Sequence, residues 1–241
     1  QEEWFADPAR CREAGIPEDT EFRTKGEMAR AMIHRLRRDG LSFAYTVFDA
    51  GYGHLPWLLR ALDGERETFL AEVHSDQAIY LADPAPAVPD RISVRGKVPS
   101  RLQAQTPPLT VTAWAHAQAP SRWRRLCVRE GEKGEVVADY LKQRVWLWDG
   151  VERQARCWHL LVRREIDGSK LKFCLSNAKP EANLRTLAEM QAARHFVERA
   201  FEDAKGACGM ADYQVRGFHA WHHHICLLYT SPSPRDGLLS R

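Results

Sequence analysis

An aspartate and a glutamate occupy positions where a carboxylate could do chemistry. Asp49 directly follows residues 42–48 (SFAYTVF), a short aromatic and β-branched segment that predicts a buried strand. In open α/β sheets, ligands bind beyond the carboxyl ends of the strands, so this position favours a ligand-binding role for Asp49. An aspartate there can also cap the glycine-containing turn of residues 49–53, and position alone does not separate the two roles.

The glutamate, Glu198, belongs to a segment from Pro180 to Lys205 that predicts a helix. At about 100° per residue, four of its polar side chains fall within a stripe of about 60°: Gln191, Arg194, Glu198 and Lys205. The neighbouring apolar stripe is expected to face the core: Val197, Phe201, Ala204 and Cys208. Spacing alone is also typical of a solvated salt-bridge ladder, because Arg194 and Glu198 are an ordinary (i, i+4) pair.

The elements that must position Asp49 alternate between helix and strand. Residues 24–40 begin with the spacing of a capping box and predict a helix that ends at a glycine. After the strand at 42–48, Pro56 suits the first turn of a helix, and residues 68–73 predict the next strand. This alternation is typical of an α/β layer.

The segments that flank this α/β layer differ from it. Residues 1–23 are expected to be irregular. Residues 77–175 are rich in prolines and short β-like runs, which predicts a mainly β insertion before the helix of Glu198. The predicted strands are 109–115, 145–148, 158–162 and 171–175.

The composition fits a soluble globular protein of one large or two small domains, with 241 residues, 44% of them hydrophobic and 28% charged. A net charge of +3 permits a nucleic-acid partner without arguing for one. The six cysteines contain no CxxC pair, which favours reduced thiols over a disulfide scaffold or a zinc site. No apolar run reaches the ~20 residues of a membrane helix, and no signal peptide opens the chain.

The last residues differ from the rest. Residues 226–236 (CLLYTSPSPRD) match a translated sequencing-library adapter, with a Ser/Pro-rich disordered tail as the alternative. We therefore expect residues 226–241 to be a non-native tail with few core contacts. The chain also begins at Gln1 without an initiator methionine, so both ends of the natural protein are expected to be absent.

The helix of Glu198 carries a family signature. Its Arg194-x3-Glu198-x6-Lys205 is the core of the Tyr-x2-Arg-x3-Glu-x6-Lys motif of a large group of cut-and-paste insertion-sequence transposases. Further segments resemble that group in the same order: 4–12 (WFADPARCR), 15–18 (GIPE), 48–53 (FDAGYG), 205–210 (KGACGM), 213–216 (YQVR) and Trp221. From about Trp4 to His224, and more weakly across the insertion, the chain thus resembles bacterial transposases with a DDE catalytic domain.

The resemblance implies an α/β fold, a ribonuclease-H-like core with a β-rich insertion before the last catalytic helix. It implies three metal-binding carboxylates, of which Asp49 is the second and Glu198 the third, holding two Mg²⁺ or Mn²⁺ ions for attack on a phosphodiester. The two carboxylates should then approach to about 4–8 Å. Arg194 and Lys205 would contact DNA phosphates beside the ions.

Two departures from the family pattern matter. Gln191 stands where the signature has tyrosine, at a position that touches no metal. No aspartate before Asp49 lies in a strand-like context, because Asp7 and Asp19 are in loop-like segments and Asp39 is at a helix end. We expect the first catalytic aspartate to be missing and this fragment to be inactive.

The resemblance also implies a domain organisation and partners. Residues 1–76 would form the first part of the core, 77–175 the insertion, 176–225 the part with the catalytic helix, and 226–241 the foreign tail. The expected partners are transposon terminal inverted repeats, target DNA and further copies of the chain, in the bacterial cytoplasm at the nucleoid and without a membrane. The alternatives are another two-metal nuclease of the same fold and a catalytically dead DNA-binding remnant.

One further cluster mixes basic and aromatic side chains as nucleic-acid contacts do. It is formed by residues 122–125 (RWRR). A solvated surface patch is the alternative interpretation.

Overall fold

The fold was determined as a computed structural model that describes residues 2–131, except 91–97, and residues 134–230, except 215. The chain divides into two compact units. Residues 25–194 form the larger unit, and residues 1–24 together with 195–241 form the smaller one. No helix among the described residues has the length and apolar character needed to cross a membrane.

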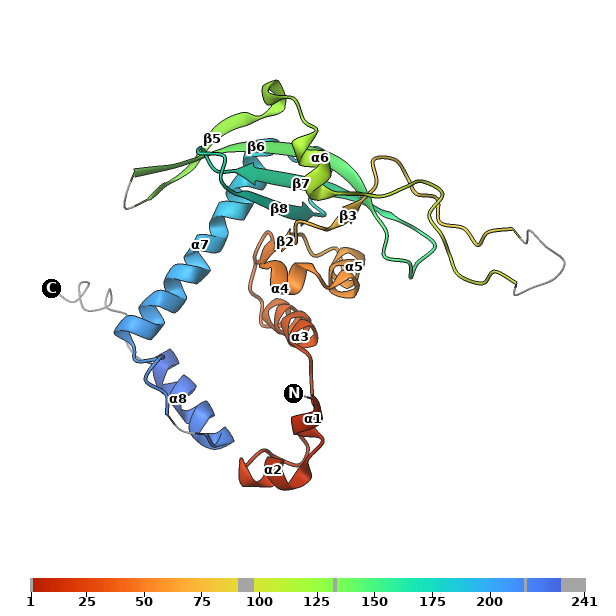
Figure 1. The fold of residues 1–241 in the computed structure, drawn as a ribbon. Coiled ribbons are helices and arrows are strands. Elements are labelled where there is room, and N and C mark those ends of the chain that lie inside the picture. The colour runs from red at the N-terminus through yellow and green to blue at the C-terminus, as the bar shows by residue number, and fades with distance from the viewer. Residues whose placement is uncertain (1, 91–97, 132–133, 215, 231–241) are drawn as a thin grey trace. The chain divides into compact units, whose positions relative to one another are not determined.

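A mixed six-stranded sheet organises the larger unit (Figure 1). Its strands lie in the order β1-β2-β8-β7-β6-β5. Strands β1 and β2 are parallel, and the other four neighbouring pairs are antiparallel. The bounds in chain order are β1 Thr46–Phe48, β2 Phe69–Val73, β5 Arg124–Gly131, β6 Gly134–Leu147, β7 Arg156–Arg164 and β8 Leu171–Ser176.

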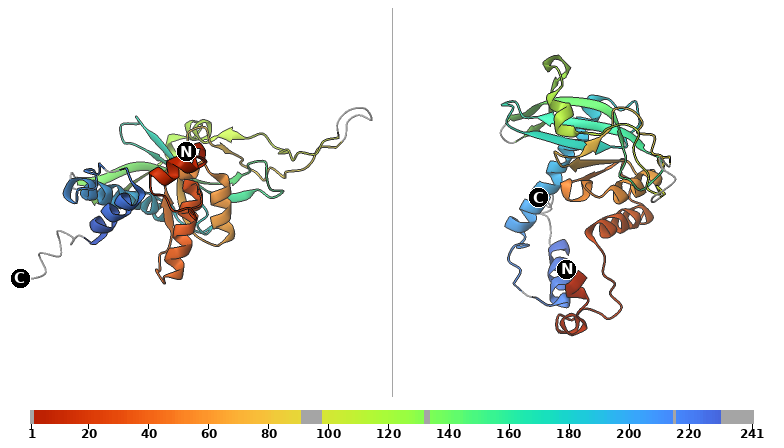
Figure 2. Two further views of the ribbon diagram at one scale, coloured as in Figure 1. Left: turned by 90° about the horizontal axis from the view of Figure 1, so that it is seen from below. Right: turned by 45° about the vertical axis from the view of Figure 1, so that its right-hand side comes forward.

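Helices cover both faces of this sheet (Figure 2). Side chains alternate between the faces along each strand, so that Leu160 packs in one apolar cluster and Leu161 in the other. The first cluster includes residues of α3 (Lys25–Arg38), α5 (Pro56–Gly64) and α6 (Val111–His116). The second includes Leu187, Ala188 and Met190, at the start of the 24-residue helix α7 (Leu184–Ala207).

The predicted elements around Asp49 are confirmed. The expected helix over 24–40 is α3, the strand expected over 42–48 is the shorter β1, and the strand expected over 68–73 is β2. Helix α5 begins at Pro56, as predicted. Between β1 and α5 lies a single helical turn, α4 (Ala50–Gly53).

Two expectations about local structure were wrong. The strand expected over 109–115 is a two-residue strand, β4 (Leu109–Thr110), which pairs with β3 (Ala78–Ile79) and leads into α6. The reason is that the Thr110 side chain accepts a hydrogen bond from the Ala113 amide at 3.1 Å and so begins a helix there.

The N-terminal residues, expected to be irregular, contain two short helices, α1 (Glu2–Phe5) and α2 (Pro8–Glu13). The Asp7 carboxylate caps α2 by accepting from the Ala9 and Arg10 amides at 3.0 and 3.2 Å. An aspartate followed by proline is a helix-start signal that the sequence carries. This cap also gives Asp7 a structural role.

The β-rich region is continuous with the sheet of β1 and β2. Strand β8 pairs directly with β2, and β7, β6 and β5 follow outward. The short 3₁₀ helix η1 (Pro120–Arg122) precedes β5. The boundaries proposed for the β-rich insertion, at residues 77 and 175, stay a proposal. Strands from both sides of these boundaries belong to the same hydrogen-bonded sheet.

The last helix, α8 (Phe218–Thr230), includes the first residues of the expected foreign tail. Cys226 is exposed, which agrees with few core contacts at that position. Residues 231–241 lie outside the described residues, so the foreign origin of the tail stays a prediction.

Candidate functional site

Asp49 lies where β1 ends, beside the end of β2. Phe48 pairs with Ala71, so Asp49 is next to Glu72 in register. The Asp49 backbone is extended (φ −79°, ψ 176°), and its carbonyl oxygen accepts from the Tyr52 and Gly53 amides at 3.1 and 2.9 Å. Its backbone therefore starts α4, while its side chain makes no capping hydrogen bond. Asp49 is exposed, and the capping alternative for its carboxylate is contradicted.

Two glycines make room for this arrangement. A β-carbon at Gly51 would lie 3.0 Å from Asp49 Oδ1, which would crowd the carboxylate. A β-carbon at Gly53 would lie 1.8 Å from the main-chain oxygen of Glu72, closer than any two such atoms can approach. The backbone of α4 thus packs directly on β2, and the FDAGYG segment needs glycine at residue 53 for this reason.

Glu72, beside Asp49 in the sheet, forms ion pairs with two basic residues. Its carboxylate pairs with Arg194 of α7 and lies 4.0 Å from Lys172 Nζ on β8. The side chains of Glu72 and Arg194 are 22% and 30% exposed, so solvent screens this pair only in part. Arg194, which the resemblance assigns to DNA phosphates, therefore joins α7 to the sheet in this structure.

Gln191 also faces the sheet. Its amide Nε2 donates to the Sγ atom of Cys174 at 3.2 Å. Burial, followed by the nearby charge of Glu72, raises the pKa of the Cys174 thiol to about 12. The residue that departs from the tyrosine of the signature thus has a packing role on a buried thiol.

The side chains of Leu187, Gln191 and Arg194 define the sheet-facing side of α7 in the larger unit. Because a helix repeats every 3.6 residues, this face continues along α7 with Glu198 and then Lys205. Both residues are exposed and belong to the smaller unit. Since Asp49 belongs to the larger unit, its approach to Glu198 stays a prediction.

The apolar stripe of α7 that was expected to face the core is not buried. Val197 and Phe201 are 54% and 50% exposed, and Ala204 and Cys208 are half-buried. The buried residues of α7 are confined to its first two turns, where the helix covers the sheet. Helical periodicity therefore continues along α7 beyond the turns whose side chains are buried.

The residues at the end of β1 fit a hard divalent cation in part. Within the described ranges, no group of three His, Cys, Asp or Glu side chains lies close enough to hold a metal ion. Asp49 nevertheless offers an exposed carboxylate, and no described side chain or amide bonds to its oxygens. Such oxygens are the ligands that Mg²⁺ and Mn²⁺ prefer.

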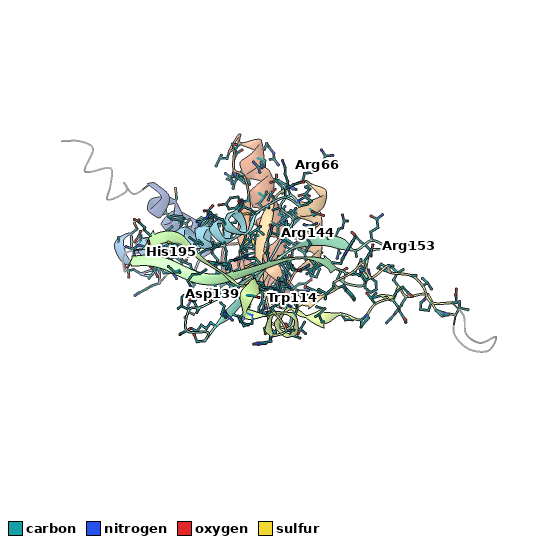
Figure 3. All side chains as sticks on the ribbon, turned by 90° about the horizontal axis from the view of Figure 1, so that it is seen from above. Arg66, Trp114, Asp139, Arg144, Arg153 and His195 are labelled. Carbon is teal, nitrogen blue, oxygen red and sulfur yellow. The ribbon has the colours of Figure 1, made fainter. Side chains whose placement is uncertain are left out.

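Two residues of the 122–125 cluster, Trp123 and Arg125, lie around a buried aspartate on β6. Arg125 Nε and Arg164 Nη2 donate to the carboxylate of Asp139 at 3.0 and 3.2 Å, and the guanidinium of Arg164 lies 4.1 Å from the centre of the Trp123 ring. The hydrogen bond from Arg125 is the main cause of the lowered pKa of Asp139. A cavity of about 500 Å³ opens beside these side chains, next to α6; Figure 3 labels Asp139 and the α6 residue Trp114.

The sheet contains parallel and antiparallel strands and is covered by helices. An exposed carboxylate follows the end of the parallel strand β1, and the long helix α7 forms an ion pair with the neighbouring strand β2. These features are those of a ribonuclease-H-like fold of the DDE nuclease class. The model of the DDE superfamily endonuclease family matches residues 1–135, more than half of the 241 residues. The chain belongs to this family of DNA-cutting enzymes. The matched residues include Asp49 and end before Arg194, Glu198 and Lys205. No curated protein matches the chain.

Proposed function

We propose that this chain is part of the catalytic domain of a bacterial insertion-sequence transposase that cuts DNA and transfers the strand by a cut-and-paste mechanism. The observation that carries the proposal is the exposed carboxylate of Asp49 at the end of β1, which makes no helix-capping hydrogen bond, in a chain of the DDE endonuclease family.

The proposed site residues divide into metal ligands and a phosphate contact. Asp49 and Glu198 would hold the divalent ions, Mg²⁺ or Mn²⁺, through their carboxylate oxygens. When bound, two such ions activate a water or a 3′-hydroxyl and stabilise the leaving oxygen. Lys205 would contact DNA phosphates, where a cationic donor neutralises charge without competing as a metal ligand.

Arg194 has two roles in this proposal. Its pairing with Glu72 supports a structural role in the free protein. Its place on the same helix face as Glu198 and Lys205 supports a contact with a DNA phosphate once DNA is bound. The expected partners are terminal inverted repeats, target DNA and further copies of the chain, at the bacterial nucleoid.

A third carboxylate is needed for full activity. The described residues before β1 form helices α1, α2 and α3 and contain no strand that could end in a catalytic aspartate. We therefore propose that the chain as given binds DNA and does not cut it.

Cleavage of DNA that carries the inverted repeats in the presence of Mg²⁺ tests this function. We expect cleavage by an N-terminally extended version that supplies an aspartate-bearing strand, and none by its Asp49→Asn and Glu198→Gln variants. Asp39→Asn is the matched control, because Asp39 is an exposed aspartate just after α3 that pairs only with Arg35 of that helix in the described structure. Cleavage that survives both site substitutions would place the chemistry elsewhere.

A further inference from the structure

Glu72 connects three elements around Asp49. Its carboxylate pairs with Arg194 of α7, and Lys172 of β8 lies within 4.0 Å. Its main-chain oxygen lies where a β-carbon at residue 53 would be, so α4 rests on the Glu72 peptide group. In the described structure, this single residue contacts the segment after Asp49 through its main chain and α7 through its side chain.

The sheet geometry places the two carboxylates on one face. Val47 and Leu70 both pack in the cluster that α7 covers. Because side chains alternate along a strand, Asp49 and Glu72, two residues further along β1 and β2, project from this same face. Neighbouring strands are about 4.8 Å apart, so the backbone of Glu72 is adjacent to that of Asp49.

The pair also sets the rotation of α7. Leu187 and Met190 fix the helix on the sheet by apolar packing, which is not directional. The bond from Arg194 to Glu72 is directional, and it lies one turn before Glu198 on the same helix face. Any rotation of α7 about its axis that moved Glu198 away from this face would break the pair.

We infer that the Glu72 side chain is a positioning residue for the proposed metal site, because it holds the Glu198 face of α7 through Arg194 on the strand whose main chain supports the Asp49 turn. This inference rests on the proposed function. Glu72 is assigned no metal ligation, because its carboxylate already faces Arg194 and Lys172.

Binding of Mn²⁺ by the full chain, measured by electron paramagnetic resonance, tests the inference. If Glu72 acts through Arg194, then Glu72→Gln and Arg194→Gln should each weaken Mn²⁺ binding about 10-fold, in the range seen for residues that orient metal ligands. The double variant should be no worse than either single variant, because both remove the same interaction.

Simple electrostatics predicts a different pattern, which separates the two explanations. Loss of a nearby anion would weaken Mn²⁺ binding, whereas loss of a nearby cation would strengthen it. Tighter Mn²⁺ binding by Arg194→Gln would therefore overturn the positioning role. So would a loss in Glu72→Gln as complete as in Asp49→Asn, because Glu72 would then itself be a ligand.

Two controls keep the outcome clear. Arg30→Gln removes a comparable half-buried ion pair, that of Arg30 with Glu65, and should leave Mn²⁺ binding unchanged. Thermal unfolding followed by circular dichroism shows whether each variant folds. If Glu72→Gln does not fold, Arg194→Gln alone tests the inference.

Unchanged Mn²⁺ binding in Asp49→Asn would contradict the proposed metal site. Loss in Asp49→Asn with unchanged binding in both pair variants would contradict only the role of Glu72.

Discussion

Gly53 packs on Glu72 so closely that a β-carbon at residue 53 would lie 1.8 Å from the Glu72 carbonyl oxygen. The opposing atom belongs to the backbone of a central strand and cannot move aside. We expect Gly53→Ala to destabilise the fold by about 3 kcal/mol or more, at the upper end of overpacking costs. Urea unfolding followed by circular dichroism measures this.

Gly64→Ala is the matched control for that substitution. Gly64 is the last residue of α5, and a β-carbon there meets nothing within 4 Å. Alanine favours a helix over glycine by up to about 1 kcal/mol, so this variant should be neutral or slightly more stable. A Gly53→Ala variant as stable as Gly64→Ala would contradict the close packing of α4 on β2.

Asp139 should give the stability of the larger unit a dependence on acid pH. Its pKa is lowered, mainly by the hydrogen bond from Arg125. A lowered carboxylate pKa contributes stability above the unfolded-state value of about 3.9, and this contribution is lost as the pH falls through the folded-state value. Asp139→Asn should therefore cost about 2 kcal/mol at pH 7, and the difference from the natural chain should shrink below about pH 4.

Thermal unfolding between pH 3 and pH 7 measures that difference. Asp167→Asn is a useful comparison, because Asp167 also has a lowered pKa but is exposed in a turn, where it bonds to Ser169. A constant gap between Asp139→Asn and the natural chain over this range would argue against the role of Asp139.

His159 should produce a second pH dependence, nearer neutrality. It is buried, its Nε2 lies 3.0 Å from the Lys179 carbonyl oxygen, and its Nδ1 has no partner among the described residues. Because a carbonyl only accepts, Nε2 carries the proton of the neutral ring. Burial lowers the pKa of His159, so folding favours the neutral form and stability should fall as the pH drops below about 6.5.

Chemical denaturation at pH 7.5 and pH 5.5 measures this loss, with His159→Gln as the comparison. The natural chain should lose more stability between the two pH values than the variant does. Equal losses would show that His159 is not the group responsible.

Cys174 should be the least reactive of the cysteines in the described structure. It is buried, and its thiol pKa is raised to about 12, so it stays protonated at pH 8. The thiolate is the reactive form, so iodoacetamide at pH 8 should modify exposed Cys226 and leave Cys174 unmodified in the folded chain. Peptide mass spectrometry detects this, and early modification of Cys174 would contradict its burial.

Local signals predicted the elements nearest Asp49. Pro56 and the apolar run before Asp49 act within a few residues, so the sequence contains all that is needed to identify α5 and β1. The same local rules identify the Asp7 and Thr110 caps in retrospect.

Contacts between distant residues could not be predicted in this way. The bond between Glu72 and Arg194 joins residues 122 positions apart, and nothing in either segment specifies the partner. The same holds for the pairing of β8 with β2, which makes the β-rich region part of one sheet with the core strands. Periodicity predicted the helix α7 but assigned the wrong residues to the core: Val197 and Phe201 are exposed, and the buried residues of α7 are Leu187, Ala188 and Met190.

The central proposal is that Asp49 and Glu198 hold the same metal ions, and a Mn²⁺ titration of the full chain tests it most directly. We predict that Asp49→Asn and Glu198→Gln each weaken Mn²⁺ binding by more than about 10-fold, while Asp39→Asn binds as the natural chain does. The Asp49→Asn/Glu198→Gln double variant should bind Mn²⁺ about as weakly as the weaker single variant, because both substitutions remove the same site. Unchanged Mn²⁺ affinity in either single variant would contradict the proposed site.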